Sequence, residues 1–217
     1  MDAAPEHLRI VVILWAKTLS AGYDQPTSDL DPGSFIFLLY NNSMNPELKH
    51  FVTKYFPKGG KALDLGCGDR IDLEELKKMG WECDGVDIIT GTDLNKIYSS
   101  PNAPYDLVYS NYVIQKLKMP KSLIKTIEIN TKEGGKFFLH TFDKSDEIAK
   151  KKYTAESIKE LFRSTDLQPE SCEVFRVWDN EAGHQHYHQI LQIIGTKRNS
   201  RNNPCSTDKE RKESSDR

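Results

Sequence analysis

Two short acidic motifs contain the residues best suited to chemistry in this sequence. Residues 62–69 read ALDLGCGD and residues 85–88 read GVDI, so Asp64 and Asp87 each stand within or directly after an apolar run. Glycines after a strand let a ligand approach the backbone closely, and a carboxylate at the end of the next strand can accept hydrogen bonds from ribose hydroxyls. The two motifs together predict a binding site for a cofactor that carries a nucleoside.

The segments around these motifs alternate between strand and helix patterns. Strands are expected over residues 61–65, 81–87, 105–110 and 136–141, and helices over residues 72–79, 121–131 and 154–166. Such alternation requires crossover connections and predicts a mostly parallel sheet with helices on both faces. We expect the glycine pair at 134–135 to close the helix that precedes the last of these strands.

The end of the folded region has a different pattern. Two strand-like runs, residues 172–178 and 186–196, are separated by a turn-like segment at 179–183. Consecutive strands joined by so short a connection pair in an antiparallel manner. We therefore expect a β-hairpin to complete the sheet.

The flanking regions are expected to be appendages of the domain at residues 61–197. Residues 1–60 are interpreted as an N-terminal helical extension that caps the site or packs on the domain, with helices over residues 8–19 and 45–55. Residues 198–217 contain no aliphatic side chain, which is typical of a disordered charged tail.

Composition limits the classes of protein that remain. A chain of 217 residues with 37% hydrophobic and 29% charged residues suits one soluble domain with appendages. Its net charge of -2 gives no electrostatic reason to expect DNA as a partner. The four cysteines lack Cys-x-x-Cys spacing, which indicates a reducing, cytoplasmic setting, and the apolar run at 10–16 is too short to cross a membrane.

A Rossmann-like α/β sheet that ends in a hairpin and carries LDLGCG after its first strand resembles the class I S-adenosylmethionine-dependent methyltransferases. Further matching segments are GVDI at 85–88, YDLVYSN at 105–111 and GGKF at 134–137. The resemblance covers roughly residues 60–197. It implies a three-layer sandwich with a seven-stranded type of sheet, S-adenosyl-L-methionine as cofactor, and a small-molecule acceptor.

The resemblance also implies which residues contact the cofactor. Asp64 would hold the methionine amino group, Asp87 the ribose hydroxyls, Ile88 the adenine face, and the pair Asp93 and Leu94 the adenine amino group. The complete set of expected cofactor contacts is Asp64, Gly66, Cys67, Gly68, Asp87, Ile88, Asp93, Leu94, Ser110 and Asn111. Arg70 replaces a glycine that is frequent in the superfamily, and it either contacts the cofactor carboxylate or is a solvated loop residue.

The acceptor side is less well defined by the sequence. Tyr112 and Val113 replace the two prolines of the motif found in enzymes that methylate DNA bases or protein glutamine, so these substrates are not expected. Candidate catalytic residues are Tyr112, His186 and His188, and candidate substrate contacts are Tyr40 and Tyr112.

The histidines of the run HQHYH at 184–188 alternate, so a strand would place His184, His186 and His188 on one face. Three interpretations stay open: a structural part of the hairpin, a general base or substrate contact, and a metal site. We expect no metal here.

Two other functions compete with methyl transfer. A non-catalytic partner protein of the same fold would explain the missing third glycine and the short link between residues 87 and 106. A nucleotide- or NAD-binding oxidoreductase would require a phosphate-binding Gly-x-Gly-x-x-Gly turn, and Ile71 occupies the position of its last glycine. The sequence makes no prediction about the oligomeric state.

Overall fold

Six strands form one mixed sheet in the computed structural model, which describes residues 43–181 and 184–199. The strands are β1 (Lys61–Leu65), β2 (Glu82–Val86), β3 (Tyr105–Asn111), β4 (Thr131–Phe142), β5 (Leu167–Glu181) and β6 (His184–Lys197). Their order across the sheet is β2-β1-β3-β4-β6-β5. Strands β1 to β4 run parallel, whereas β6 is antiparallel to both β4 and β5. The expected parallel sheet with a terminal hairpin is confirmed.

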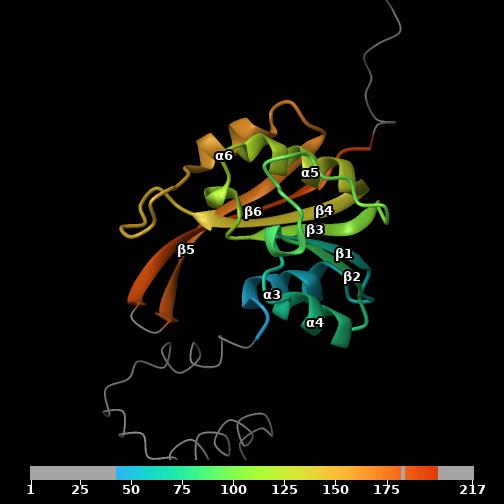
Figure 1. The fold of residues 1–217 in the computed structure, drawn as a ribbon, viewed down its shortest axis with the longest axis horizontal. Coiled ribbons are helices and arrows are strands. Elements are labelled where there is room, and N and C mark those ends of the chain that lie inside the picture. The colour runs from blue at the N-terminus through green and yellow to red at the C-terminus, as the bar shows by residue number, and fades with distance from the viewer. Residues whose placement is uncertain (1–42, 182–183, 200–217) are drawn as a thin grey trace, which may run out of the picture.

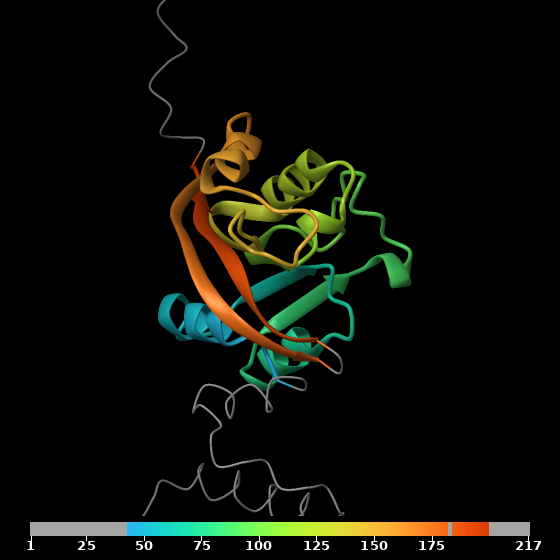
Figure 2. The same ribbon diagram turned by 90° about the vertical axis from the view of Figure 1, so that its left-hand side faces the viewer.

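Helices cover both faces of this sheet. They are α3 (Pro46–Tyr55), α4 (Ile71–Lys78), α5 (Pro120–Asn130) and α6 (Ala155–Phe162), with single 3-10 turns η2 (Ile88–Thr90) and η3 (Ile114–Lys116). Figure 1 shows α5 and α6 on one side of the sheet and α3 and α4 on the other. The fold is therefore the expected three-layer α/β sandwich. Figure 2 shows that the β5–β6 hairpin curves away from the rest of the sheet toward the layer of α3 and α4.

Helix α3 begins at a well-formed cap and is anchored in the core. The Asn45 side chain accepts a hydrogen bond from the Leu48 backbone N–H at 3.0 Å, and a proline occupies the first helical position. Leu48, Phe51 and Val52 are buried against the sheet, and full burial of one such side chain stabilises a fold by about 1.5–3 kcal/mol. This part of the expected extension thus packs on the sheet.

Apolar side chains form one core on each face of the sheet. On the α5–α6 face, the core includes Leu63, Val108, Ile124, Phe137 and Ile193. On the α3–α4 face, it includes Leu48, Phe51, Ala62, Trp81, Tyr109 and Phe138. Alternation along β1 sends Leu63 to the first core, and it sends Ala62 and Asp64 to the face of the second. A carboxylate therefore points into the α3–α4 layer.

The described residues form six strands, one fewer than in the seven-stranded type of sheet that the resemblance implies. Between β2 and β3 the chain contains only the 3-10 turn η2 and irregular segments. The link from residue 87 to residue 104 is too short for a helix and a strand of ordinary length together. One edge of the sheet is consequently β2, and the other is β5.

Two element boundaries also differ from expectation. The glycine pair at 134–135 lies inside β4, where the register against β3 shifts between Tyr105 and Leu107. Gly134 adopts a φ of 71° in this bulge, and such a left-handed backbone conformation favours glycine. The hairpin strands continue through most of the expected turn, and Glu181 pairs with His184. Only residues 182–183 separate the two strands.

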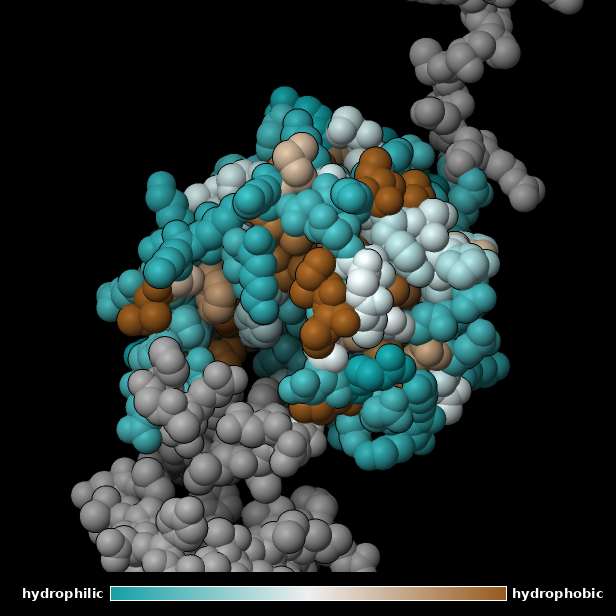
Figure 3. Space-filling view, in the orientation of Figure 1, coloured by the Kyte–Doolittle hydropathy of each residue, from teal (hydrophilic) through white to brown (hydrophobic). Residues whose placement is uncertain are grey.

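Several expectations concern residues outside the described part of the chain. These are the helix at 8–19, the cap formed by residues 1–42, the substrate candidate Tyr40 and the charged tail beyond residue 199. Among the described helices, none has the length and apolar character needed to cross a membrane. Figure 3 shows one face of the molecule as mainly hydrophilic, with small separate hydrophobic patches.

Candidate functional site

The glycine turn after β1 is held by hydrogen bonds to β2 and by the side chain of Val113, which follows β3. The backbone N–H groups of Gly66 and Cys67 both donate to the Val86 carbonyl, at 2.8 and 3.1 Å. Gly66 has a φ of 95°, and a Cβ atom built there would lie 2.2 Å from Cγ2 of Val113. The turn therefore requires glycine at position 66 for both conformation and space.

Asp87 lies against this turn, as its place at the end of β2 predicts. Its Oδ2 accepts a hydrogen bond from the Gly68 backbone N–H at 3.1 Å, and its Oδ1 accepts one from Ile89 N–H at 3.0 Å. The same carboxylate caps η2. A carboxylate has about four acceptor sites, so these two bonds leave capacity for hydroxyl donors from a ligand.

A cavity of about 320 Å³ opens at the carboxyl ends of β1 and β3. This is where the strand order changes direction, the usual ligand site of open α/β sheets. The cavity is lined by Ser43, Asn45, Asp64, Gly66, Cys67, Asp69, Arg70, Ile71, Asp72, Asn111, Tyr112 and Val177. Six of the residues singled out from the sequence therefore share one cavity: Asp64, Gly66, Cys67, Arg70, Asn111 and Tyr112.

Carboxylates dominate the electrostatics of this cavity. Asp64 is only 4% exposed, and its burial, reinforced by the nearby charges of Asp72 and Asp87, holds the pKa of its carboxyl well above the usual range. Burial likewise raises the pKa of Asp72, against the opposing effect of hydrogen bonds from Asn45 and Asn111. Arg70 lines the same cavity and only partly offsets the negative charge at Asp64. A positive group bound beside Asp64 would favour the ionised form of its carboxyl.

Asp72 was not selected from the sequence, although it connects three parts of the site. Its Oδ1 accepts a hydrogen bond from the Asn45 backbone N–H at 2.8 Å, and its Oδ2 accepts one from the Asn111 side-chain amide at 2.8 Å. The Oδ1 atom of Asn111 is buried without a hydrogen-bond partner. The sequence signal that could have identified Asp72 is its position as an acidic residue in the first turn of α4, directly after the glycine motif, because this turn lines the cavity.

Other expected cofactor residues lie apart from the cavity lining. Ser110 is fully buried and donates its hydroxyl to the Leu65 carbonyl at 2.7 Å, so it supports the end of β1. Leu94 is buried in the core, and Asp93 accepts two hydrogen bonds from Asn95. Ile88 is 69% exposed. The adenine contacts inferred for residues 88, 93 and 94 therefore stay predictions.

Tyr112 reaches the cavity through an unusual backbone conformation, with a φ of 57°. Its ring packs against Phe142 and against His140, with ring centroids 5.6 and 5.7 Å apart. His140, which was not selected from the sequence, donates from Nε2 to the Gln192 amide oxygen at 2.9 Å, and its Nδ1 accepts from Asn45 at 3.3 Å. This neutral imidazole connects the hairpin to the wall of the cavity.

Protonation of His140 is expected to destabilise the fold in acid. Burial lowers its pKa to about 4. The unfolded chain therefore binds this proton near pH 6.5 and the folded protein only near pH 4, so stability falls as pH falls through that window, by roughly 3 kcal/mol in total. In urea unfolding from pH 7 to pH 4, His140→Gln should remove this part of the pH dependence. Parallel pH profiles for the variant and the natural protein would contradict the assignment.

The hairpin histidines lie on the same face of the sheet as the cavity. Val177 pairs with His188, and Asp179 pairs with His186, so these four side chains share one face of the β5–β6 ladder. Val177 lines the cavity, and the His188 ring packs on Phe142 with centroids 4.7 Å apart. The side chain of His184 lies outside the described part of the chain.

Comparison with known proteins defines the class. A family model described as a methyltransferase domain matches residues 40–194, so the chain belongs to this family, within the class I S-adenosylmethionine-dependent superfamily. Similar solved structures include TehB from Haemophilus influenzae (TM-score 0.60, 16% identity, 76% of this chain and 67% of the other). Another is a Methanosarcina mazei S-adenosylmethionine-dependent methyltransferase (TM-score 0.59, 13% identity, 72% of this chain and 99% of the other). A third is the Burkholderia thailandensis 1,6-didemethyltoxoflavin-N1-methyltransferase with bound S-adenosylhomocysteine (TM-score 0.56, 15% identity, 92% of this chain and 92% of the other).

S-adenosylmethionine is the cofactor of this family, and the residues of the cavity fit it. The ligand carries positive charge on its sulfonium and amino groups, and Asp64 and Asp72 supply buried carboxylates whose pKa values are raised by burial. A bound cation would favour the ionised form of these carboxylates. Asn111 adds a buried acceptor without a partner.

Proposed function

We propose that this protein transfers the methyl group of S-adenosylmethionine to a small-molecule acceptor. The observation that carries the proposal is a single cavity lined both by the glycine turn and by Tyr112, which follows β3, and Val177 of β5. The cavity volume of about 320 Å³ lies within the usual range for small-molecule sites. The similar Burkholderia enzyme was solved with 1,6-didemethyltoxoflavin, which supports an acceptor of this size class.

The cofactor side of the site follows from its charges and exposed surfaces. Asp64 receives the amino group, because its buried carboxylate gains most from a positive partner. Asp87 receives the ribose hydroxyls from its fixed position beside Gly68. Ile88 and Ile89, which are 69% and 74% exposed, offer apolar surface directly after Asp87 for the adenine ring.

The acceptor side needs positioning more than acid–base chemistry. Bound S-adenosylmethionine supplies an activated methyl group, so the protein must align a nucleophile with the carbon–sulfur bond and exclude water. Tyr112 is suited to positioning, since Phe142 and His140 hold its ring at the cavity wall. His186 and His188 lie farther along the same face.

Asp87→Asn is expected to weaken binding of S-adenosylhomocysteine by roughly 10- to 100-fold. The amide retains one acceptor oxygen but loses the negative charge, and a hydrogen bond to a charged group contributes about 1.5–3 kcal/mol. Isothermal titration calorimetry measures the change directly. Asp166→Asn, at an exposed position after α6, is the matched control and should bind normally. Equal affinity in the two variants would contradict the ribose assignment.

Transfer itself is tested with labelled S-adenosylmethionine and a panel of small amines, thiols, hydroxyl compounds and carboxylates. Transfer to one compound class, lost in Asp87→Asn at limiting cofactor, is the expected result. Tight binding of S-adenosylhomocysteine without transfer to any compound would instead favour a non-catalytic partner protein.

A further inference from the structure

The β5–β6 hairpin carries a cluster of metal-ligating side chains beside the cavity. Asp179, His186 and His188 each present one ligand atom, and these three atoms lie within 4.8 Å of one another. Nε2 of His186 and Nε2 of His188 are 2.9 Å apart, and Nε2 of His188 is 3.6 Å from Oδ2 of Asp179. Two imidazoles and one carboxylate form a common ligand set for divalent transition metals.

A buried carboxylate fixes the orientation of one of these rings. Oδ2 of Asp146, a residue only 1% exposed, lies 2.8 Å from Nδ1 of His188. This bond places the proton of His188 on Nδ1 and directs the lone pair of Nε2 toward His186 and Asp179. A metal-bound histidine usually donates a hydrogen bond from its other ring nitrogen to a carboxylate, which fixes the orientation of the ring. Asp146 occupies the position of that carboxylate relative to His188.

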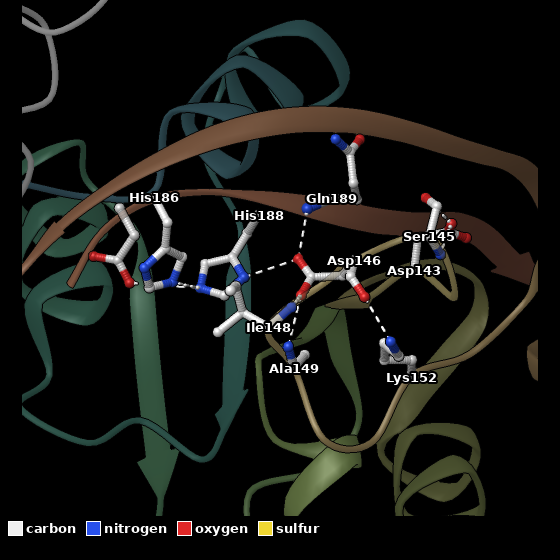
Figure 4. A network of polar contacts seen from close by, with 10 residues as sticks. Asp143, Ser145, Asp146, Ile148, Ala149, Lys152, His186, His188 and Gln189 are labelled. Atoms are coloured by element: carbon white, nitrogen blue, oxygen red, sulfur yellow. Dashed lines mark hydrogen bonds and ion pairs between the residues drawn. The ribbon is translucent and has the colours of Figure 1, made fainter.

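Asp146 is itself held rigidly, as Figure 4 shows. Its Oδ2 also accepts a hydrogen bond from the Gln189 backbone N–H at 2.7 Å, and its Oδ1 accepts from Ile148 and Ala149 N–H at 2.9 and 2.7 Å. Lys152 donates to the Asp146 backbone carbonyl at 2.6 Å. The loop after β4 thus folds around one carboxylate that supports His188.

The spacing of the ligand atoms needs little adjustment for a metal ion. Two nitrogens bound to tetrahedral zinc at 2.0–2.1 Å lie roughly 3.3 Å apart. The two imidazole nitrogens are now 2.9 Å apart, a distance at which they share one proton. A metal ion would take the place of that proton, and the rings would separate by only a few tenths of an ångström.

We propose that Asp179, His186 and His188 bind a divalent transition-metal ion, with Asp146 as the residue that orients His188. Three protein ligands leave at least one coordination position for water or a substrate atom. The site lies on the face that carries Val177, and the His188 ring packs on Phe142, which in turn packs on Tyr112. The metal therefore sits next to the acceptor side of the cavity. The proposal differs from the expectation from the sequence, which was that these histidines bind no metal.

The test is a titration of the full-length, chelator-treated protein with Zn²⁺ in competition with a chromophoric chelator. We expect one Zn²⁺ per chain with a micromolar or lower Kd, and Co²⁺ should give a visible absorption band from the same site. Mg²⁺ in excess should not compete, since it prefers oxygen ligands.

Variants locate the site. His186→Ala and His188→Ala should each weaken Zn²⁺ binding at least 100-fold, and Asp146→Asn by about 10- to 100-fold through the loss of orientation. The matched control is His50→Ala, at an exposed position on α3, which should leave binding unchanged. Asp179→Asn keeps the size of the side chain and should also weaken Zn²⁺ binding. This variant distinguishes loss of a metal ligand from loss of folding.

Two results would overturn the metal site. One is the absence of stoichiometric Zn²⁺ binding by the natural protein, and the other is undiminished binding by the His186→Ala/His188→Ala double variant. S-adenosylhomocysteine binding, measured on the same samples, reports separately on the fold and on the cofactor site. Failure of the metal proposal is therefore distinguishable from failure of the proposed methyl transfer.

Discussion

Asp64→Asn is expected to stabilise the ligand-free protein and to impair cofactor binding at the same time. The buried carboxylate has a raised pKa because it loses hydration and lies near Asp72 and Asp87. The neutral amide avoids this cost, so we expect an increase of about 1 kcal/mol in the free energy of unfolding, or roughly 2–4 °C in Tm. Affinity for S-adenosylmethionine should fall by roughly 10- to 100-fold, since the amino group loses a charged acceptor.

The pH dependence of stability and of cofactor affinity provides a second test of the Asp64 carboxylate. A raised pKa means that the folded protein holds the proton more tightly than the unfolded chain, so this group lowers stability as pH rises from about 3.9 toward the folded pKa. Cofactor affinity should rise over the upper part of this range, because the ionised form binds the amino group. Asp64→Asn should lose both trends.

Thermal unfolding with and without S-adenosylhomocysteine measures the two effects together. The natural protein should gain more in Tm from the ligand than Asp64→Asn does. Asp166→Asn serves as the control for removal of an exposed carboxylate and should change neither quantity appreciably. A ligand-free Asp64→Asn protein with lowered Tm and normal affinity would show that this carboxylate is structural.

The conformation of the glycine turn after β1 was predictable because its signal is local in the sequence. Strand, glycine turn and helix follow one another within residues 61–78, and the acid after β2 comes less than ten residues later. Parallel strands bring their carboxyl ends to one edge, so the proximity of Asp87 and Gly68 followed from the pattern. Within the described part of the chain, the count of six strands was less evident, since only the short link between residues 87 and 106 indicated it.

The rest of the site depends on contacts between distant segments. Asn45 before α3, Asp72 on α4 and Asn111 on β3 meet through hydrogen bonds across 27 and 39 residues of sequence. The partner of His188, Asp146, comes from a loop 42 residues earlier. Periodicity predicted that His186 and His188 share a face, but no local pattern indicates which carboxylate lies behind them.

Gly66→Ala is expected to lower the free energy of unfolding by roughly 2–5 kcal/mol and to abolish cofactor binding. A methyl group at this position would lie 2.2 Å from Cγ2 of Val113, and the φ of 95° is unfavourable for alanine. Overpacking costs about 1–3 kcal/mol and the left-handed conformation about 1–2 kcal/mol. Urea unfolding and titration with S-adenosylhomocysteine measure the two losses.

A second substitution separates the collision from the backbone cost. Val113→Ala removes the atom that meets the new methyl group, so Gly66→Ala/Val113→Ala should recover part of the stability that Gly66→Ala loses. Gly91→Ala is the matched control, because Gly91 has a φ of 90° but no heavy atom within 4 Å of an added Cβ, and it should show the backbone cost alone. If Gly66→Ala and Gly91→Ala were equally destabilised, steric exclusion by Val113 would be wrong. The expected difference would mean that the fold itself requires glycine at position 66, because Val113 leaves no room for a larger residue. The cofactor proposed for this cavity would then bind to a turn whose shape Val113 already enforces.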